Sequence, residues 1–315
     1  MLLIQWFFVV NPCAGGGKAL TLWPLIAEAL KKERVNFEFA YTESSSHATE
    51  LVRKAVADGH RYVAAVGGDG TAHDCIQGIM TQGLVPSNKI TFTVIPLGTG
   101  NDWIKMWSLK GGWQNAVQRL KRERIAVQEV AKVVLFEANG NQKVAYSHNV
   151  IGLCMDAFVV KYSLSQTKPS WLPSAIYYYV ISLKCLFAFE TPRLKIRMDD
   201  DARIVEGAIF NLNVGVCKYS AGGAIFCPQA IATDGLLALT LMGDFSHWEV
   251  IRNSSMYYTG KILEHKKVHG YQAQKIRIEP LEAGGELPEI ELDGEYLGRG
   301  MVEIEVLPKA LNIWI

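Results

Sequence analysis

The stretch Tyr62-Val-Ala-Ala-Val-Gly-Gly-Asp-Gly-Thr71 decides the fold, because a short apolar run passes directly into a glycine-rich turn. Such a run is typical of a buried parallel strand. Two further turns follow apolar runs in the same way, Asn11-Pro-Cys-Ala-Gly-Gly-Gly-Lys18 and Leu97-Gly-Thr-Gly-Asn-Asp102. Glycine lets backbone N–H groups approach an anion, and a helix that starts after the turn adds the positive end of its dipole. Together the three turns predict a phosphate-binding site.

Two of these turns also carry a carboxylate, Asp69 and Asp102. Carboxylate oxygens beside a phosphate site can hold Mg²⁺, so the sequence indicates nucleotide chemistry. The first turn is not a Walker A loop, since Pro12 stands where that loop needs glycine and Ala19 follows its lysine. Taken alone, its three glycines would fit a flexible turn equally well. Three such turns at successive strand ends favour the phosphate site.

The segment 1–130 alternates strand and helix, which predicts a Rossmann-like α/β domain. The expected strands are Trp6 to Val10, Phe37 to Tyr41, Tyr62 to Val66 and Thr91 to Ile95. Helices with one apolar face are expected over Ala19 to Glu33 and His47 to Asp58. All three glycine turns then fall at the carboxyl ends of the strands, where an open α/β sheet binds its ligand.

The segment 131–315 is β-rich and predicts a second domain of the β-sandwich type, whose last residues return to pack on the first domain. Its expected strands are Lys132 to Phe136, Leu194 to Met198, Ile209 to Val216, Leu236 to Met242, Lys275 to Glu279 and Val302 to Leu307. One long helix over Ser174 to Phe189 is inserted among them. We expect the active site in the cleft between the two domains.

Composition narrows the possible partners. The 315 residues carry 32 basic and 31 acidic side chains, so no long-range field would recruit nucleic acid. Six cysteines without metal-type spacing favour reduced thiols and a cytoplasmic location. The apolar opening lacks a cationic region typical of a targeting segment. The apolar stretch 171–189 contains Pro173 and Lys184 and is too short to cross a membrane.

The glycine turns carry a family resemblance. Asn11 to Lys18, Gly67-Gly-Asp-Gly-Thr71 and Pro96 to Asp102 resemble three signatures of the diacylglycerol kinase and lipid kinase family, closest to its single-chain bacterial type. The resemblance continues through Gly222-Gly223 and Pro228-Gln-Ala-Ile-Ala-Thr-Asp-Gly235 to Leu292-Asp-Gly-Glu295, and so covers nearly the whole chain. The GGDGT turn alone is also found in NAD kinases, but its combination with LGTGND and a late DGE is specific.

The resemblance implies an ATP- and Mg²⁺-dependent kinase whose acceptor is the hydroxyl of a lipid at a membrane surface. Glu295 would accept the proton of the attacking hydroxyl with support from Asp293, and Asp69 would act in catalysis. Asp69 and Asp102 would hold the catalytic Mg²⁺, and Ile231, Asp234 and Leu236 a structural Mg²⁺. The implied nucleotide contacts are Asn11, Pro12, Cys13, Ala14, Gly15, Thr42, Gly67, Gly68, Asp69, Gly70, Thr71, Ala72, His73, Asp74, Gly98, Thr99, Gly100 and Asn101.

The physical case for the Asp293-Gly-Glu295 segment stands beside the resemblance. A lipid alcohol has a very high pKa, so a carboxylate within reach of its proton is a sensible acceptor. Two carboxylates that flank a glycine turn lie close enough for one to raise the pKa of the other. The same segment also reads as an ordinary hairpin turn.

Two departures from the family pattern stand out. His73-Asp74 replaces the usual Asn-Glu, which puts the contacts of this pair in question, and Thr233-Asp-Gly235 replaces Asp-Asp-Gly. Two alternatives remain: an NAD kinase-like enzyme, and a catalytically inactive nucleotide sensor.

The nature of the lipid is left open by the sequence. Trp171 and Tyr177 to Tyr179 form an aromatic group that suits a membrane interface, although a core helix packed on the β domain is the favoured explanation. Both readings hold if one face of the helix lines a cleft for acyl chains. No residue distinguishes one lipid hydroxyl from another.

Overall fold

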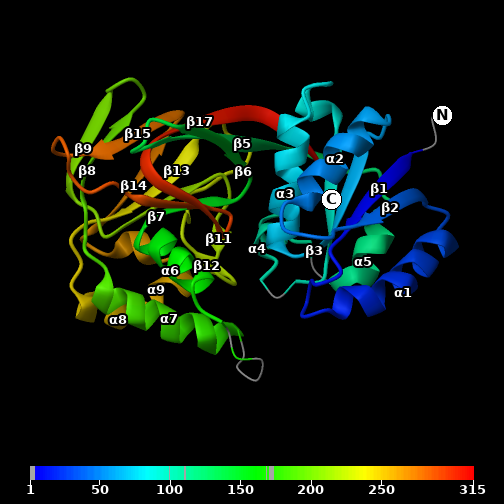
Figure 1. Ribbon diagram of the computed structural model, residues 1–315, viewed down its shortest axis with the longest axis horizontal. Coiled ribbons are helices and arrows are strands. Elements are labelled where there is room, and N and C mark those ends of the chain that lie inside the picture. The colour runs from blue at the N-terminus through cyan, green and yellow to red at the C-terminus, as the bar shows by residue number, and fades with distance from the viewer. Residues whose placement is uncertain (1–3, 99, 110, 168, 170–173) are drawn as a thin grey trace.

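A computed structural model describes residues 4–98, 100–109, 111–167, 169 and 174–315. It has two halves joined by one sheet, as Figure 1 shows. The strands of this sheet follow the order β14-β13-β10-β7-β16-β17-β4-β3-β1-β2, with five more strands attached off this path. In the described residues no helix has the length and apolar character needed to cross a membrane.

The first half is a parallel sheet covered on both faces, so the predicted α/β class is confirmed. Its strands are β1 (Gln5–Val10), β2 (Asn36–Tyr41), β3 (Tyr62–Gly67) and β4 (Thr91–Pro96). Its helices are α1 (Lys18–Lys32), α2 (His47–Ala57), α3 (Asp69–Thr81), α4 (Asp102–Met106), α5 (Gly112–Arg119) and the short 3₁₀ turn η1 (Ser87–Lys89).

Alternating residues of β1 supply two separate cores. Phe8 and Val10 pack with Ile26 of α1 in one buried cluster, whereas Val9 packs with Val52 of α2 in another. Because side chains of a strand alternate between faces, a strand covered on both sides must be apolar throughout. This explains why the strand runs before the glycine turns are continuous.

The second half is the expected β-rich domain with an inserted helix. Its strands are β5 (Ile125–Glu137), β6 (Gln142–Ser147), β7 (Val150–Cys154), β8 (Arg193–Met198), β9 (Arg203–Ala208), β10 (Asn211–Gly215), β11 (Tyr219–Ser220), β12 (Ala224–Ile225), β13 (Leu237–Met242), β14 (Val268–Ala273), β15 (Lys275–Pro280), β16 (Glu289–Leu292) and β17 (Glu295–Trp314). Its helices are α6 (Met155–Leu164), α7 (Ser174–Ala188), α8 (His247–Asn253), α9 (Met256–Thr259) and the 3₁₀ turn η2 (Ile262–Glu264).

Strand β17 is longer than the predicted strand over Val302 to Leu307, and this difference positions the site. It starts at Glu295 and pairs antiparallel with β5 as far as Trp314, while Asn312 and Ile313 pair with β4 of the first half. The pattern was obscured because the register shifts between Leu307 and Leu311. One continuous strand therefore ties the Asp293-Gly-Glu295 turn to the parallel sheet.

Candidate active site

The three glycine-rich turns lie against one another. A Cβ built on Gly98 would lie 2.5 Å from the Cα of Gly68, and one built on Gly15 would lie 2.5 Å from the carbonyl oxygen of Leu97. No side chain fits at such distances, so these contacts require glycine. The turns at the ends of β1, β3 and β4 thus form one backbone-lined surface, as the sequence led us to expect.

Side chains fix the first two turns to each other. Asn11 Nδ2 donates a hydrogen bond of 3.0 Å to Thr71 Oγ1, and a side chain on Gly67 would collide with Thr71. The backbone N–H of Thr42 donates to the carbonyl of Val10 at 2.9 Å, which sets Thr42 beside the first turn. Most of the residues implied in nucleotide binding therefore lie close together in these turns, although their contact with ATP stays a prediction. Thr99 lies outside the described residues.

The two predicted metal carboxylates are close together. Asp69 Oδ1 accepts the backbone N–H of Asp102 at 2.8 Å. A Cβ on Gly100 would lie 3.0 Å from Asp69 Oδ2 and 3.7 Å from Asp102 Oδ2, so both carboxylates face the same glycine. Burial raises the pKa of Asp69, and the neighbouring Asp102 raises it further. Two crowded acids of this kind are suited to a divalent cation.

Asp102 also connects the two halves of the molecule. Its Oδ1 pairs with Lys105 Nζ at 2.6 Å, and its Oδ2 accepts the backbone N–H of Gly222 at 2.7 Å. Gly222 lies in the turn between β11 and β12, within the Gly222-Gly223 element of the family pattern. The second half therefore contributes backbone directly to the site.

Glu295 reaches the GGDGT turn from the start of β17. A Cβ built on Gly70 would lie 2.8 Å from Glu295 Oε1. The Glu295 side chain remains accessible to solvent, yet the surrounding protein raises the pKa of its carboxyl. Asp74 and Asp293 raise this pKa further, whereas His73 lowers it. The sequence anticipated that Asp293 would raise the pKa of Glu295, but desolvation is the larger cause.

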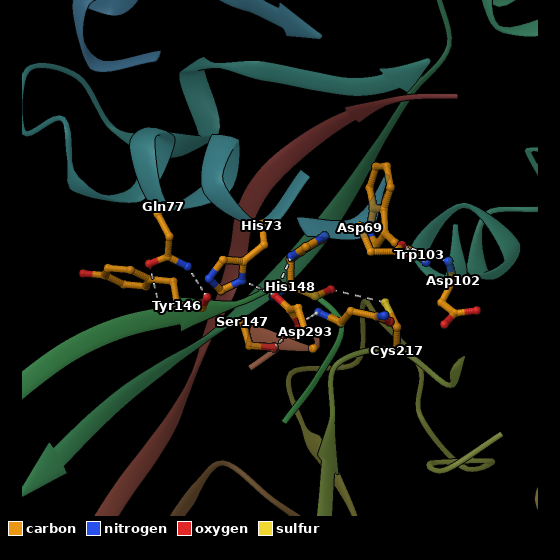
Figure 2. A network of polar contacts seen from close by, with 12 residues as sticks. Asp69, His73, Gln77, Asp102, Trp103, Tyr146, Ser147, His148, Cys217 and Asp293 are labelled. Carbon is orange, nitrogen blue, oxygen red and sulfur yellow. Dashed lines mark hydrogen bonds and ion pairs between the residues drawn. The ribbon is translucent and has the colours of Figure 1, made fainter. Parts of the chain in front are cut away.

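Asp293 lies in a buried network that Figure 2 shows. Its Oδ2 receives His73 Nδ1 at 2.9 Å and His148 Nδ1 at 2.8 Å. Its Oδ1 accepts from Ser147 Oγ at 2.5 Å and from the backbone N–H of Asn149 at 3.0 Å. Asp293 and Gly294 form a two-residue hairpin turn between β16 and β17, and both have a positive φ, of 54° and 92°. The segment is therefore a hairpin turn, and the role of its carboxylates in proton transfer stays a prediction.

The network changes the acidity of its members in opposite directions. Burial would raise the pKa of Asp293, but the two imidazoles hold it well below its usual range. Burial would lower the pKa of His73, but the hydrogen bond to Asp293 and its charge raise it above the usual value. His73, His148 and Asp293 could also hold a metal ion, because their ligand atoms lie within 4.8 Å of one another. Hydrogen bonds already account for the arrangement.

A second acidic pair lies below this turn. Glu291 of β16 and Asp156 of α6 face each other across Gly152, where a side chain would collide with both carboxylates. Burial raises the pKa of Asp156 to about 6 and raises that of Glu291 well above its usual value. Glu291 Oε2 accepts the backbone N–H of Gly294 at 2.6 Å. The pair therefore supports the turn that presents Glu295.

The implied structural-metal residues form a tight turn. Asp234 Oδ1 accepts the backbone N–H of Leu236 at 3.1 Å, and the carbonyl of Ile231 accepts that of Thr233 at 2.8 Å. Glu129 is buried beside this turn, and its Oε1 accepts the backbone N–H of Gly235. Its other oxygen, Oε2, has no hydrogen-bond partner among the described residues. This unpaired carboxylate oxygen is compatible with a cation here, and the metal role stays a prediction.

Several residues of the site were not anticipated. Ser147 and His148 join β6 to β7 and bind Asp293, and Gln128 accepts the indole N–H of Trp103 at 2.8 Å and of Trp107 at 2.9 Å. The available signal for the first pair was a run of three consecutive polar residues directly before the apolar strand β7. His73 lies against Asp293, while a backbone N–H of the α2 segment donates to Asp74. Nucleotide contacts by His73 and Asp74 remain predictions.

Comparison with protein-family models gives two matches. A model described as the diacylglycerol kinase catalytic domain matches residues 5–133. A model described as the YegS C-terminal NAD kinase beta sandwich-like domain matches residues 149–315, which is more than half of the chain.

Individual proteins agree with these matches. The chain is 25% identical over 296 residues to a diacylglycerol kinase of Staphylococcus saprophyticus, covering 92% of this chain and 88% of the relative. It is 24% identical over 311 residues to a diacylglycerol kinase of Mycobacterium tuberculosis, covering 97% and 93%. A crystal structure titled as a diacylglycerol kinase from Bacillus anthracis superimposes with a TM-score of 0.72 at 22% identity, over 100% and 97% of the two chains. At that identity the likeness supports the fold.

Proposed function

The chain belongs to the family of bacterial diacylglycerol kinases and YegS-type lipid kinases, and from this premise we propose that it transfers the γ-phosphate of ATP to a lipid hydroxyl. One observation carries the proposal. The Glu295 carboxylate lies beside Gly70, so a proton acceptor stands directly over the turn that would cradle the phosphates. Phosphoryl transfer needs little more than such positioning and neutralisation of charge.

The nucleotide phosphates would lie on the joined glycine turns. Gly15, Gly68 and Gly98 keep the backbone of the three turns in contact, and α3 begins at Asp69 with its N-terminus toward this surface. Backbone N–H groups and the helix dipole would then bind the phosphate oxygens. Asn11 and Thr71 would hold the first turn in place through their hydrogen bond.

Mg²⁺ would be held by Asp69 and Asp102, where it would neutralise charge on the phosphates. Both carboxylates are close to Gly100, and the raised pKa of Asp69 reflects its burial and, after that, the neighbouring charge of Asp102. Lys105, at 2.6 Å from Asp102, now compensates part of this negative charge.

Glu295 would accept the proton of the acceptor hydroxyl as the new oxygen–phosphorus bond forms and ADP leaves. Its raised pKa suits this task as long as the carboxyl stays ionised at the working pH, because a more basic carboxylate is a better proton acceptor. Asp293 is buried and fully engaged with its neighbours, so it would position the turn.

The lipid would approach over the helices of the second half. On α7, Ile181, Cys185 and Leu186 are buried in the core, while the opposite face exposes Tyr179 at 62% and Phe187 at 63%. Further exposed apolar side chains lie on the neighbouring helices α6, α8 and α9: Leu164, Trp248 and Tyr258. Figure 1 shows α7 and α8 along the lower edge of the second half, with α6 and α9 above them. Trp171 lies outside the described residues.

An apolar surface of this kind suits transient contact with a bilayer, where aromatic side chains enter the interface. The core reading and the interface reading of this helix are thus compatible, because each concerns a different face. We place the enzyme at the cytoplasmic surface of a membrane, with a membrane lipid as its partner.

The test is transfer of label from γ-radiolabelled ATP with Mg²⁺ to a panel of acceptors. The panel contains diacylglycerol, phosphatidylglycerol, a sphingoid base and a polyprenol in mixed micelles, and NAD in solution. Label in one lipid supports the proposal and identifies the acceptor. Label in NAD alone would replace the proposal with the NAD kinase alternative, and ATP binding without any transfer would indicate the inactive sensor.

A further inference from the structure

Two histidines hold the buried carboxylate of Asp293, and one of them stands where the family pattern has asparagine. His73 comes from α3 and His148 from the link between β6 and β7, and both are buried. Their Nδ1 atoms approach the same oxygen of Asp293, at 2.9 and 2.8 Å. A carboxylate oxygen only accepts hydrogen bonds, so each Nδ1 donates its hydrogen to Asp293.

The two histidines differ in what else they face. His73 lies one turn after Gly70 on α3, and Glu295 Oε1 lies 2.8 Å from the position of a Cβ on Gly70, so His73 and Glu295 meet on one face of this helix. The charge of His73 there favours the ionised form of Glu295, and Asp293, Asp74 and Glu295 all favour the charged form of His73. His148 acts instead on Asp69 and packs its ring 5.7 Å from that of Trp103. Only His73 of this pair therefore bears on Glu295.

Three carboxylates act on His73, namely Asp293, Asp74 and Glu295, and they also repel one another. Without a nearby cation this repulsion would favour a protonated Glu295. Desolvation disfavours the ionised form of Glu295, which is the form that can accept a proton, and Asp74 and Asp293 add to this effect. His73 is the group that opposes them. An imidazolium among three acids favours the charged state of each.

We propose that His73, oriented by Asp293, is a positioning residue whose imidazolium keeps Glu295 ionised and ready to accept the proton of the substrate hydroxyl. The inference rests on the proposed function in that it takes Glu295 as the acceptor. His73 keeps its own proton throughout, while the proton of the hydroxyl passes to Glu295. An asparagine at this position would supply the hydrogen bond but no charge.

The test exploits that difference. In His73→Asn the side-chain amide takes the place of Nδ1–H and keeps the hydrogen bond to Asp293, while the charge is lost. The measurement is kcat/KM for the lipid from pH 5 to 9 at saturating ATP. We expect the acid limb of the profile to move upward by about one pH unit, because Glu295 without a neighbouring cation takes up its proton more readily.

His148→Asn is the matched control. It also keeps a donor to Asp293 and removes an imidazole, but that imidazole does not act on Glu295. Its acid limb should coincide with that of the unaltered protein, whatever the rate. An unmoved acid limb in His73→Asn, or an equal movement in both variants, would overturn the inference.

A substrate-free measurement separates this inference from the proposed function. Histidine-labelled protein is titrated by NMR, with the His73 signals assigned from their absence in His73→Asn. In Glu295→Gln the titration midpoint of His73 should fall, because one of the carboxylates that favours its charged form is gone. An unchanged midpoint would contradict the pairing, and neither result depends on finding a phosphorylated lipid.

Discussion

Glu295 Oε1 lies where a side chain on Gly70 would have to go, at 2.8 Å from the position of a Cβ. Gly70 belongs to the GGDGT turn of the first half, where we propose that the phosphates bind, and Glu295 is the first residue of β17, which leads back from the second half. This contact brings Glu295, the proposed proton acceptor, next to the turn where we propose that the phosphates bind. The proposed function depends on this contact between Glu295 and Gly70.

Gly70→Ala should reduce turnover without unfolding the protein. Gly70 lies in α3 with an ordinary φ, where alanine is a better helix former, and the obstructing atom is the end of a flexible side chain. The displaced carboxylate should cost about 10- to 100-fold in kcat, since small misplacements are that costly. Steady-state kinetics and a thermal melt give the two readouts. Full activity in the variant would show that the Glu295 position is immaterial.

The ion pair of His73 with Asp293 predicts that the stability of the protein depends on pH. The pKa of His73 is raised in the folded protein, so the pair contributes stability that is fully present below the unfolded value of about 6.5. This contribution is lost as the pH rises through the folded pKa. The Tm difference between the unaltered protein and His73→Asn should therefore be largest near pH 6 and shrink toward pH 9. A difference that stays constant over this range would contradict the charge on His73.

The Glu291 and Asp156 pair predicts a second loss of stability with rising pH, over a lower range. Burial raises the pKa of Glu291, so the unaltered protein loses stability as the pH rises above the unfolded value of about 4.3. Glu291→Gln mimics the protonated acid and avoids this loss. Its Tm advantage should grow between pH 5 and pH 8, measured by differential scanning fluorimetry beside the exposed control Glu43→Gln. A variant that is less stable than the unaltered protein at pH 8 would show that Glu291 is ionised and favourably paired.

The exposed apolar face of the second half predicts vesicle binding. The double variant Tyr179→Ser with Trp248→Ser should sediment less with phosphatidylglycerol-containing vesicles than the unaltered protein, because both side chains are mostly exposed. Leu84→Ser removes an equally exposed apolar side chain from the first half and serves as control. Equal sedimentation of all three proteins would remove the membrane-facing role of these helices.

The local elements of the first half could be predicted from the sequence because both faces of its sheet are covered. Continuous apolar runs such as Tyr62 to Val66 end in glycines, and both signals are local. The contact of Gly68 with Gly98 could also be expected, because neighbouring parallel strands end at the same edge of a sheet.

The surroundings of Asp293 could not be predicted, because they depend on long-range pairing. His73 and Asp293 are 220 positions apart, and β17, which follows Asp293, continues until it pairs with β4 of the first half. The interruption between Leu307 and Leu311 hid that strand in the sequence. The imidazole of His148 also carries no signal until the register of β7 with β16 is known.

The most direct test of the central claim is label transfer from γ-radiolabelled ATP to the lipid acceptor by the unaltered protein and by Glu295→Gln, with Mg²⁺ and with a chelator. We predict labelled lipid that requires Mg²⁺ and falls about 10²-fold or more in Glu295→Gln, with KM for ATP little changed. Glu303→Gln, a change at a half-exposed position of the same strand, should retain full transfer. Transfer by Glu295→Gln at the unaltered rate would contradict the account.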